Sequence, residues 1–250
     1  MEDQFSLDGK TAIVTGGSRG IGYAIAAAFI QKGARVIITA RGETALLEAA
    51  SSLGGTCIGK RCDNADPADI ARVVEEAWRL SPVDILVNNA GISPFYKRAE
   101  QVTPAEFDEV VSVNLRGTYF CSVEVANRSF AEQRPLSIVN IGSVGGTTPL
   151  ERVAVYGATK AGINLLTKSM ALEWADRNVR VNCIAPGWTE TEFTDELFAS
   201  RWGDKLRGDI PMGRFATGQD ISGAAVFLAS DAAQYVTGAI LPVDGGRLLR

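Results

Sequence analysis

The sequence predicts one doubly wound α/β domain over residues 1–250, and two observations support this fold class. Short runs rich in β-branched and apolar residues alternate along the chain with longer helical stretches. Runs such as Ile85-Leu86-Val87 are apolar without alternation, which is typical of strands covered on both faces. This βα alternation indicates a mostly parallel sheet with right-handed crossovers. A chain of 250 residues that is 46% hydrophobic can bury one substantial core.

The predicted elements follow one another in a regular order. Seven segments are predicted as strands: Thr11–Thr15, Arg35–Thr39, Thr56–Arg61, Ile85–Asn88, Ser137–Ile141, Arg180–Ile184 and Ala239–Val243. The helical stretches between them are Ile21–Gln31, Glu43–Ser51, Pro67–Arg79, Pro104–Glu132, Val153–Ala175 and Gly218–Ala229. The chain contains no internal repeat and no linker composition, so we expect a single domain.

One segment, about 187–214, breaks this alternation and is too long for an ordinary connection. It carries Trp188, Phe193, Phe198 and Trp202 among charges, threonines and glycines. These aromatic residues favour a lid over an apolar ligand. The alternative is a helical excursion that packs on the domain or on a partner subunit.

Composition and charge exclude several classes of function. The net charge is −4 and the 25 basic residues are scattered, so the sequence indicates no nucleic-acid or membrane partner. The acidic start Met1–Gln4 leads into no apolar stretch long enough for a signal peptide, and we expect a cytoplasmic protein. The four cysteines, Cys57, Cys62, Cys121 and Cys183, are expected to be small buried hydrophobic residues, with no metal site and no disulfide framework.

A glycine-rich turn, Thr15-Gly16-Gly17-Ser18-Arg19-Gly20-Ile21-Gly22, joins the first strand to the first helix. Glycines at such a turn let a phosphate approach the free N–H groups of the helix N-terminus. The turn therefore predicts a dinucleotide site that includes Gly16, Ser18, Gly20, Ile21 and Gly22.

The tip of the second strand predicts which dinucleotide binds. An acidic residue there would hold the ribose hydroxyls of NAD, but the tip carries Ala40 followed by Arg41. Arg19 in the glycine turn supplies a second cation. Two arginines at the position of a 2′-phosphate favour NADP(H). The alternative is that both are solvated surface residues.

The chain contains no histidine, so proton transfer near neutral pH needs another residue. Tyr156 and Lys160 lie four residues apart, which places them on one face of a helix. Ser143 follows the fifth strand, at the sheet edge where open α/β sheets bind their ligands.

Together these motifs resemble the short-chain dehydrogenase/reductase family. The resemblance rests on the glycine turn, Asn88-Asn89-Ala90-Gly91, Asn114, Ser143, Tyr156 to Lys160, Pro186-Gly187 and Val243-Asp244-Gly245-Gly246, in the order and spacing of the family. It implies a Rossmann sheet of seven parallel strands, a nicotinamide cofactor and a catalytic tetrad of Asn114, Ser143, Tyr156 and Lys160. Gly142, before Ser143, departs from relatives that often have a second serine there.

The resemblance also implies further cofactor contacts. Asp63 matches a residue that binds adenine, and Asn89 and Gly91 match residues near the adenosine ribose. Pro186, Thr189 and Thr191 lie in the loop on the nicotinamide side. Relatives place isoleucine or valine at Thr189, so this chain differs there.

The chemistry explains why these residues are needed together. A tyrosine with an ordinary pKa of about 10 exchanges protons poorly near pH 7. We expect the Lys160 ammonium, together with the positive nicotinamide of the oxidised cofactor, to lower the pKa of Tyr156. The resemblance implies that Lys160 also binds the nicotinamide ribose. Ser143 would donate to the substrate oxygen. The resemblance implies that Asn114 holds a water that connects Lys160 to solvent.

These residues predict an NADPH-dependent carbonyl reductase that also works in reverse on a small alcohol. An alternative is 3-oxoacyl-(acyl-carrier-protein) reductase, whose members carry an arginine where this chain has Leu172, although Arg128 and Arg134 remain near the other docking site. A non-catalytic NADP-binding sensor is a further alternative, but such proteins normally lose the tyrosine or the lysine. The apolar faces of the fourth and fifth predicted helices, together with the resemblance, predict a homotetramer.

Overall fold

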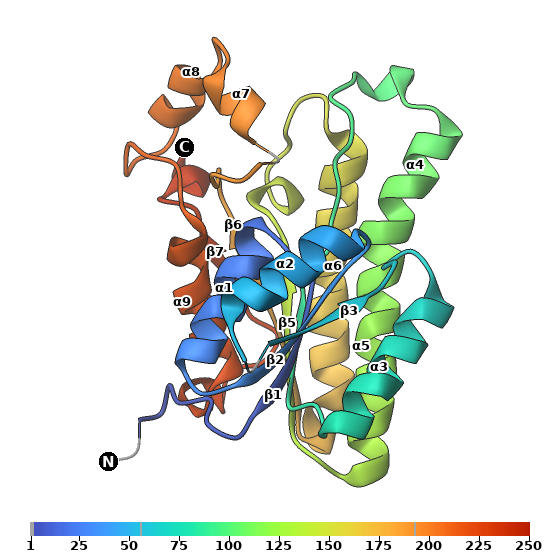
Figure 1. Ribbon diagram of the computed structural model, residues 1–250. Coiled ribbons are helices and arrows are strands. Elements are labelled where there is room, and N and C mark those ends of the chain that lie inside the picture. The colour runs from blue at the N-terminus through green and yellow to red at the C-terminus, as the bar shows by residue number, and fades with distance from the viewer. Residues whose placement is uncertain (1–2, 56, 193) are drawn as a thin grey trace.

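Figure 1 shows the computed structural model, which describes residues 3–55, 57–192 and 194–250. Within these residues, parallel strands form a seven-stranded sheet in the order β3-β2-β1-β4-β5-β6-β7. The strands are β1 (Thr11–Thr15), β2 (Arg35–Ala40), β3 (Cys57–Arg61), β4 (Ile85–Asn88), β5 (Leu136–Ile141), β6 (Val179–Pro186) and β7 (Ile240–Val243). The predicted α/β fold is confirmed, while Thr56 of the third predicted strand lies outside the described residues.

Helices cover both faces of the sheet (Figure 1). They are α1 (Gly20–Gln31), α2 (Glu43–Leu53), α3 (Pro67–Leu80), α4 (Pro104–Val111), α5 (Gly117–Glu132), α6 (Ala154–Trp174), α7 (Asp195–Ala199), α8 (Gly203–Gly208) and α9 (Gly218–Ala229). Helices α1, α2 and α9 bury one core against the sheet, and α3, α5 and α6 bury the other. Successive residues of β1 alternate between the two cores, because Ile13 faces the second and its neighbours Ala12 and Val14 face the first.

The single helix predicted over Pro104–Glu132 is wrong in its middle. A π-helical segment, Ser112–Arg116, separates α4 from α5. The Nδ2 of Asn64, in the loop after β3, donates to the carbonyl of Val113 at 2.9 Å. This loop approaches so closely that a Cβ atom on Gly117 would collide with Asn64. The irregular turn is therefore fixed by a contact between segments that are far apart in the sequence.

The predicted lid, residues 187–214, contains α7 and α8 above the sheet (Figure 1). The ring of Phe198 stacks on Phe215 with 3.7 Å between centroids, and Trp188 meets Phe198 edge-on at 6.1 Å. These aromatic residues thus pack on one another and on the domain, while Trp202 is 48% exposed. Phe193, the other aromatic residue of the predicted lid, lies outside the described residues.

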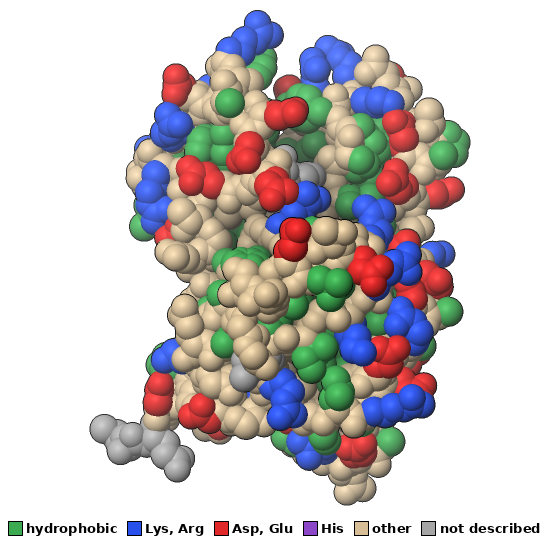
Figure 2. All heavy atoms as spheres, in the orientation of Figure 1, with side chains coloured by type: hydrophobic (Ala, Val, Ile, Leu, Met, Phe, Trp, Pro, Cys, Tyr) green, Lys and Arg blue, Asp and Glu red, His purple; other side chains and the backbone are tan. Residues whose placement is uncertain are grey.

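The four cysteines are unpaired, and Cys62, Cys121 and Cys183 are buried as expected. Among the described residues, no helix has the length and apolarity to cross a membrane. On the face drawn in Figure 2, acidic and basic side chains are interspersed, so neither sign forms a continuous area there.

Candidate active site

The site forms where the strand order reverses, between β1 and β4. Thr15, the last residue of β1, accepts hydrogen bonds on Oγ1 from the N–H groups of Asn89 and Ala90, both at 3.0 Å. Asn89 in turn donates through Nδ2 to the carbonyls of Thr15 and Gly16 at 2.9 and 3.0 Å. The two ligand-binding segments are therefore bonded directly to each other. The side chain of Asn89 therefore fixes the glycine turn against the segment after β4. No sequence pattern predicted that the Thr15 hydroxyl joins the same two segments.

The glycine loop, residues 16–22, has a backbone that depends on glycine at two positions. Gly16 and Gly20 adopt left-handed φ values of +64° and +56°. A Cβ on Gly16 would lie 3.0 Å from both the Asn89 side chain and the Ala90 backbone. No side chain of the described residues caps α1, which leaves the N–H groups of its first turn open to a phosphate. Three further predicted residues, Ser18, Ile21 and Gly22, lie in this loop or at the start of α1.

The predicted adenosine side contains two exposed arginines. Arg41, just beyond the tip of β2, forms no hydrogen bond or ion pair with the described residues and is exposed. Arg19 is also exposed, but its Nη1 pairs with Glu192 of the lid at 2.7 Å. Asp63, after β3, accepts the N–H of Ala65 on Oδ1 at 2.9 Å. No sequence pattern predicted the ion pair between Arg19 and Glu192.

Ser143, Tyr156 and Lys160 come together at the ends of β5 and the start of α6. Ser143 lies two residues after the end of β5, and its Oγ accepts the N–H of Gly145 at 3.0 Å. Tyr156 is half-buried in the first turn of α6. Lys160 is only 4% exposed, and its Nζ donates to the carbonyl of Ile141 at 2.7 Å. The same Nζ lies 5.6 Å from the ring centroid of Tyr156.

Asn114, in the π-helical segment, joins this group by its own contacts. Its side-chain amide donates to the carbonyl of Ile92 at 2.9 Å and accepts the N–H of Ile92 at 2.8 Å. A Cβ on Gly91 would lie 3.5 Å from both Asn114 Oδ1 and Lys160 Nζ. The carboxamide and the ammonium therefore border the same small space, and the structure brings the four predicted tetrad residues to one place.

Burial sets the ionisation of the two proton-carrying groups. It lowers the pKa of Lys160 to about 8, because the charged ammonium loses hydration. Burial also raises the pKa of Tyr156, and a hydrogen bond from Ser143 opposes this effect without reversing it. The expected lowering of the Tyr156 pKa is thus wrong as far as the protein's own residues act on the phenol. The physical reason is that the phenolate would lose hydration on burial, and this loss outweighs the hydrogen bond from Ser143.

The loop on the predicted nicotinamide side leaves β6 at Pro186, which pairs with Val243 of β7. Thr189 is buried and donates from Oγ1 to the carbonyl of Gly187 at 3.1 Å, so its side chain is used within the loop. Thr191 faces the glycine loop, since a Cβ on Gly20 would lie 3.2 Å from Thr191 Cγ2. Of the two threonines, Thr191 is the one beside the dinucleotide turn.

Gly142 has a structural reason for departing from serine. A Cβ there would lie 2.7 Å from Cys183 Sγ and 3.2 Å from Asn164 Oδ1. The thiol of Cys183 thus takes up the space that a larger residue at position 142 would need.

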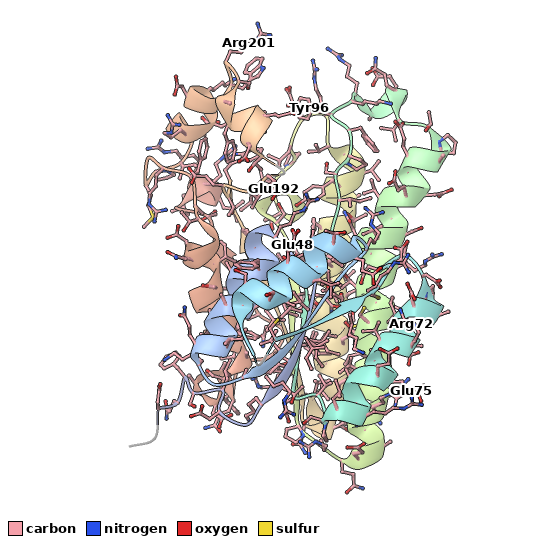
Figure 3. The ribbon with its side chains drawn as sticks, viewed as in Figure 1. Glu48, Arg72, Glu75, Tyr96, Glu192 and Arg201 are labelled. Carbon is pink, nitrogen blue, oxygen red and sulfur yellow. The ribbon has the colours of Figure 1, made fainter. Side chains whose placement is uncertain are left out.

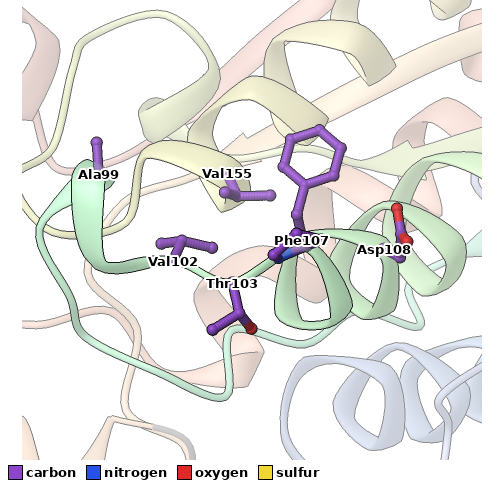
Figure 4. A pocket seen from close by; sticks show the side chains of 7 residues that line it. Ala99, Val102, Thr103, Phe107, Asp108 and Val155 are labelled. Carbon is purple, nitrogen blue, oxygen red and sulfur yellow. The ribbon is translucent and has the colours of Figure 1, made fainter.

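Two hollows of similar volume lie among the described residues. One of about 490 Å³ lies beside α4 and the start of α6, where Phe107, Val102 and Val155 line it (Figure 4). The other, of about 510 Å³, lies between the lid and the chain's C-terminal segment, and Trp188 and Met212 line it. Val155 precedes Tyr156 in the sequence, so the first hollow borders the helix that carries the phenol.

The chain is similar in sequence to known proteins over nearly its whole length. A family model described as enoyl-(acyl carrier protein) reductase matches residues 16–247. The chain belongs to the short-chain dehydrogenase/reductase family. It is 39% identical to D-threitol dehydrogenase of Mycolicibacterium smegmatis, over 98% of this chain and 95% of that protein. It is 40% identical to the 3-oxoacyl-[acyl-carrier-protein] reductase of Salmonella typhimurium, over 96% of this chain and 98% of that protein.

Solved structures agree with this assignment. A gluconate 5-dehydrogenase from Burkholderia cenocepacia, in complex with NADP and tartrate, superposes with a TM-score of 0.94 at 34% identity, covering 99% of this chain and 98% of that one. The predicted family and the predicted oxidoreduction of CH–OH groups are confirmed. NADP-bound relatives support the predicted cofactor, NADP(H).

Proposed function

We propose that this protein reduces a ketone to a secondary alcohol with NADPH, and that Asn114, Ser143, Tyr156 and Lys160 are its catalytic residues. The observation that carries the proposal is the small space beside Gly91. The buried ammonium of Lys160 and the buried carboxamide of Asn114 border this space, and Lys160 lies one helical turn after Tyr156. Burying a lysine ammonium lowers the stability of the fold. In the family, the matching lysine serves catalysis.

The direction of the Tyr156 pKa keeps the phenol protonated near neutral pH, which is the state that carbonyl reduction needs. A phenol whose pKa burial raises stays protonated, so it can give its proton to the developing alkoxide. Ser143 would donate to the same oxygen and orient the carbonyl. The nicotinamide cofactor supplies the hydride when it is bound.

Lys160 would refill the phenol after each turnover. Its pKa of about 8 makes the ammonium a better proton source near neutral pH than an ordinary lysine. Asn114 lies beside that ammonium and would hold a water that leads to solvent. Lys160 would also bond the nicotinamide ribose, as the family resemblance implies.

The cofactor contacts proposed are those of the predicted residues around the glycine loop and the lid. Gly16, Gly20 and Gly22 with the start of α1 would hold the pyrophosphate, and Asp63 the adenine. Arg41 and Arg19 would bind the 2′-phosphate, because both lie at the surface beside the tip of β2 and the glycine loop. Gly91 would face the ribose and Thr191 the nicotinamide side.

We propose polyhydroxylated ketones and their alcohols as substrates. Relatives named for threitol, galactitol and gluconate support this class. The alternative, 3-oxoacyl-(acyl-carrier-protein) reduction, has the support of a relative at 40% identity. Two observations weigh against it. Leu172, which is 84% exposed, stands at the position where reductases of that type carry a docking arginine. Arg134, at the other docking site, already pairs with Asp84 at 3.0 Å.

A cofactor-oxidation assay tests this proposal. NADPH consumption would be followed with ketoses, keto-acids of sugars, diketones and an acetoacetyl thioester. We expect the polyhydroxylated ketones to have the highest kcat/KM. Turnover confined to the acyl thioester would support the alternative, and binding of NADPH without any turnover would support a sensor.

We further propose that the protein works in the cytoplasm as a homotetramer. Four unpaired cysteines fit a reducing compartment. Apolar side chains on three neighbouring helices, Phe107 of α4, Tyr119 of α5 and Leu165 and Leu172 of α6, are between 41% and 84% exposed, which suits burial against other subunits.

A further inference from the structure

The lid is tied to the cofactor loop by an ion pair. Arg19, in the glycine loop, donates from Nη1 to Oε2 of Glu192 at 2.7 Å. The two residues are 173 positions apart, so only the fold brings them together. Figure 3 labels Glu192 between the lid helices and α2.

The segment that carries Glu192 is ordered by its own hydrogen bonds. Thr194 donates from Oγ1 to the carbonyl of Thr189 at 2.7 Å and accepts the N–H of Thr191 at 3.0 Å. The methyl group of Thr191 also lies against Gly20, at the start of α1. These contacts place Glu192 beside the glycine loop.

We infer that Glu192 is a specificity-determining residue, because it competes with the 2′-phosphate of NADP(H) for Arg19. This inference rests on the proposed use of Arg19 as a phosphate-binding residue. A guanidinium that turns toward the phosphate leaves the lid carboxylate, so phosphate binding releases the lid from the glycine loop. NADH has a hydroxyl at that position and leaves the ion pair intact.

The effect is modest, because both side chains are mostly in solvent. Their exposed fractions are 72% and 66%, and ion pairs this exposed change an equilibrium by about fivefold or less. The carboxylate also repels the phosphate directly, and salt screens this repulsion. We expect removal of the charge to tighten NADPH binding by about three- to tenfold at low ionic strength.

Equilibrium titrations of intrinsic fluorescence test the binding claim. Glu192→Gln should bind NADPH about three- to tenfold more tightly than the parent and NADH within about twofold. Glu196→Gln is the matched control, since it removes an exposed lid carboxylate from the first turn of α7 and should change neither affinity by more than about twofold. In an Arg19→Gln background the effect of Glu192→Gln should fall to about twofold or less, because only the direct repulsion between the carboxylate and the phosphate remains to be removed.

Hydrogen exchange of the lid gives a second readout that does not depend on activity. Adenosine 2′,5′-bisphosphate carries the phosphate without the nicotinamide, and adenosine 5′-monophosphate lacks the 2′-phosphate. The first should speed exchange at 187–192, and the second should not. The segment should already exchange fast in Glu192→Gln.

The outcomes separate the two proposals. If the parent prefers the bisphosphate but Glu192→Gln tightens NADPH and NADH equally, or neither, the competition is refuted and the proposed cofactor stands. If the parent binds the two nucleotides equally, the proposed NADPH preference fails and the competition fails with it. Ketone reduction with either cofactor would still support the proposed reaction.

Discussion

Tyr156 is the residue on which the proposed chemistry depends. Replacing it with phenylalanine removes the hydroxyl and leaves a ring of nearly the same volume in the first turn of α6. We expect Tyr156→Phe to lower kcat by about a hundredfold or more, because proton donation is lost, while the Kd for NADPH stays within about twofold. Steady-state kinetics and a binding titration measure the two effects. A variant that keeps more than about a tenth of kcat would refute the assignment.

The lowered pKa of Lys160 predicts how the free energy of unfolding changes with pH. Its pKa of about 8 in the folded chain lies below its ordinary value of 10.5, so the unfolded chain binds more protons between these values. The folded state therefore carries a penalty that is complete below pH 8 and fades as the pH rises toward 10.5. Relative to Lys160→Met, the parent should gain about 2 kcal/mol of unfolding free energy from pH 7 to 9.5.

Urea denaturation of both proteins at several pH values checks this expectation. The measured quantity is the difference between the two free energies of unfolding, which cancels the titration of other groups. A difference that stays constant across this range would show that Lys160 keeps its ordinary pKa.

At the scale of elements, the junction between α4 and α5 positions Asn114. The close approach of Asn64 to Gly117 leaves no room for a methyl group. Gly117→Ala should lower the free energy of unfolding by about 1–3 kcal/mol through overpacking. It should also reduce kcat, because Asn114 lies three residues earlier, in the π-helical segment that ends just before Gly117.

A second glycine provides the control for that substitution. Gly223 is exposed in α9, and a Cβ there would meet nothing within 4 Å. Gly223→Ala should raise the free energy of unfolding by about 0.5–1 kcal/mol and leave kcat unchanged. If both variants behaved alike in urea denaturation, the steric argument at Gly117 would be wrong.

The tip of β2 is the element that should select the cofactor. Ala40→Asp combined with Arg41→Ala places a carboxylate where the proposed 2′-phosphate would bind and removes a cation. We expect the parent to prefer NADPH by about tenfold or more in kcat/KM and the double variant to lose or invert this preference. The change should appear mainly in KM, because the catalytic residues lie at the other end of the site. Equal efficiency of the parent with both cofactors would contradict this expectation.

At the scale of the whole molecule, the exposed leucines of α6 predict assembly. Leu165 and Leu172 are 65% and 84% exposed and seven residues apart, so they lie on one face of the helix. We expect sedimentation at micromolar concentration to report a homotetramer, and Leu165→Glu with Leu172→Glu to shift it toward smaller species. Leu47→Glu on α2, where the side chain is 56% exposed, is the control and should not change the mass. A parent protein that sediments as a monomer would refute the proposal.

The sequence by itself determined the sheet, the glycine turn and the candidate residues of the tetrad. Apolar runs report burial on both faces of a strand, and glycine or tyrosine at a fixed spacing reports local backbone and side-chain chemistry. Both kinds of signal are contained within short windows, so no tertiary information is needed to find them.

Only the tertiary structure decided how these residues act on one another. The π-helical segment depends on Asn64, the glycine loop on Asn89, and the orientation of Arg19 on Glu192. The pKa direction of Tyr156 depends on how much water the surrounding elements remove, and the place of the Lys160 ammonium depends on the carbonyl of Ile141. Each of these contacts joins positions dozens of residues apart or depends on burial, and local sequence patterns carry no record of either.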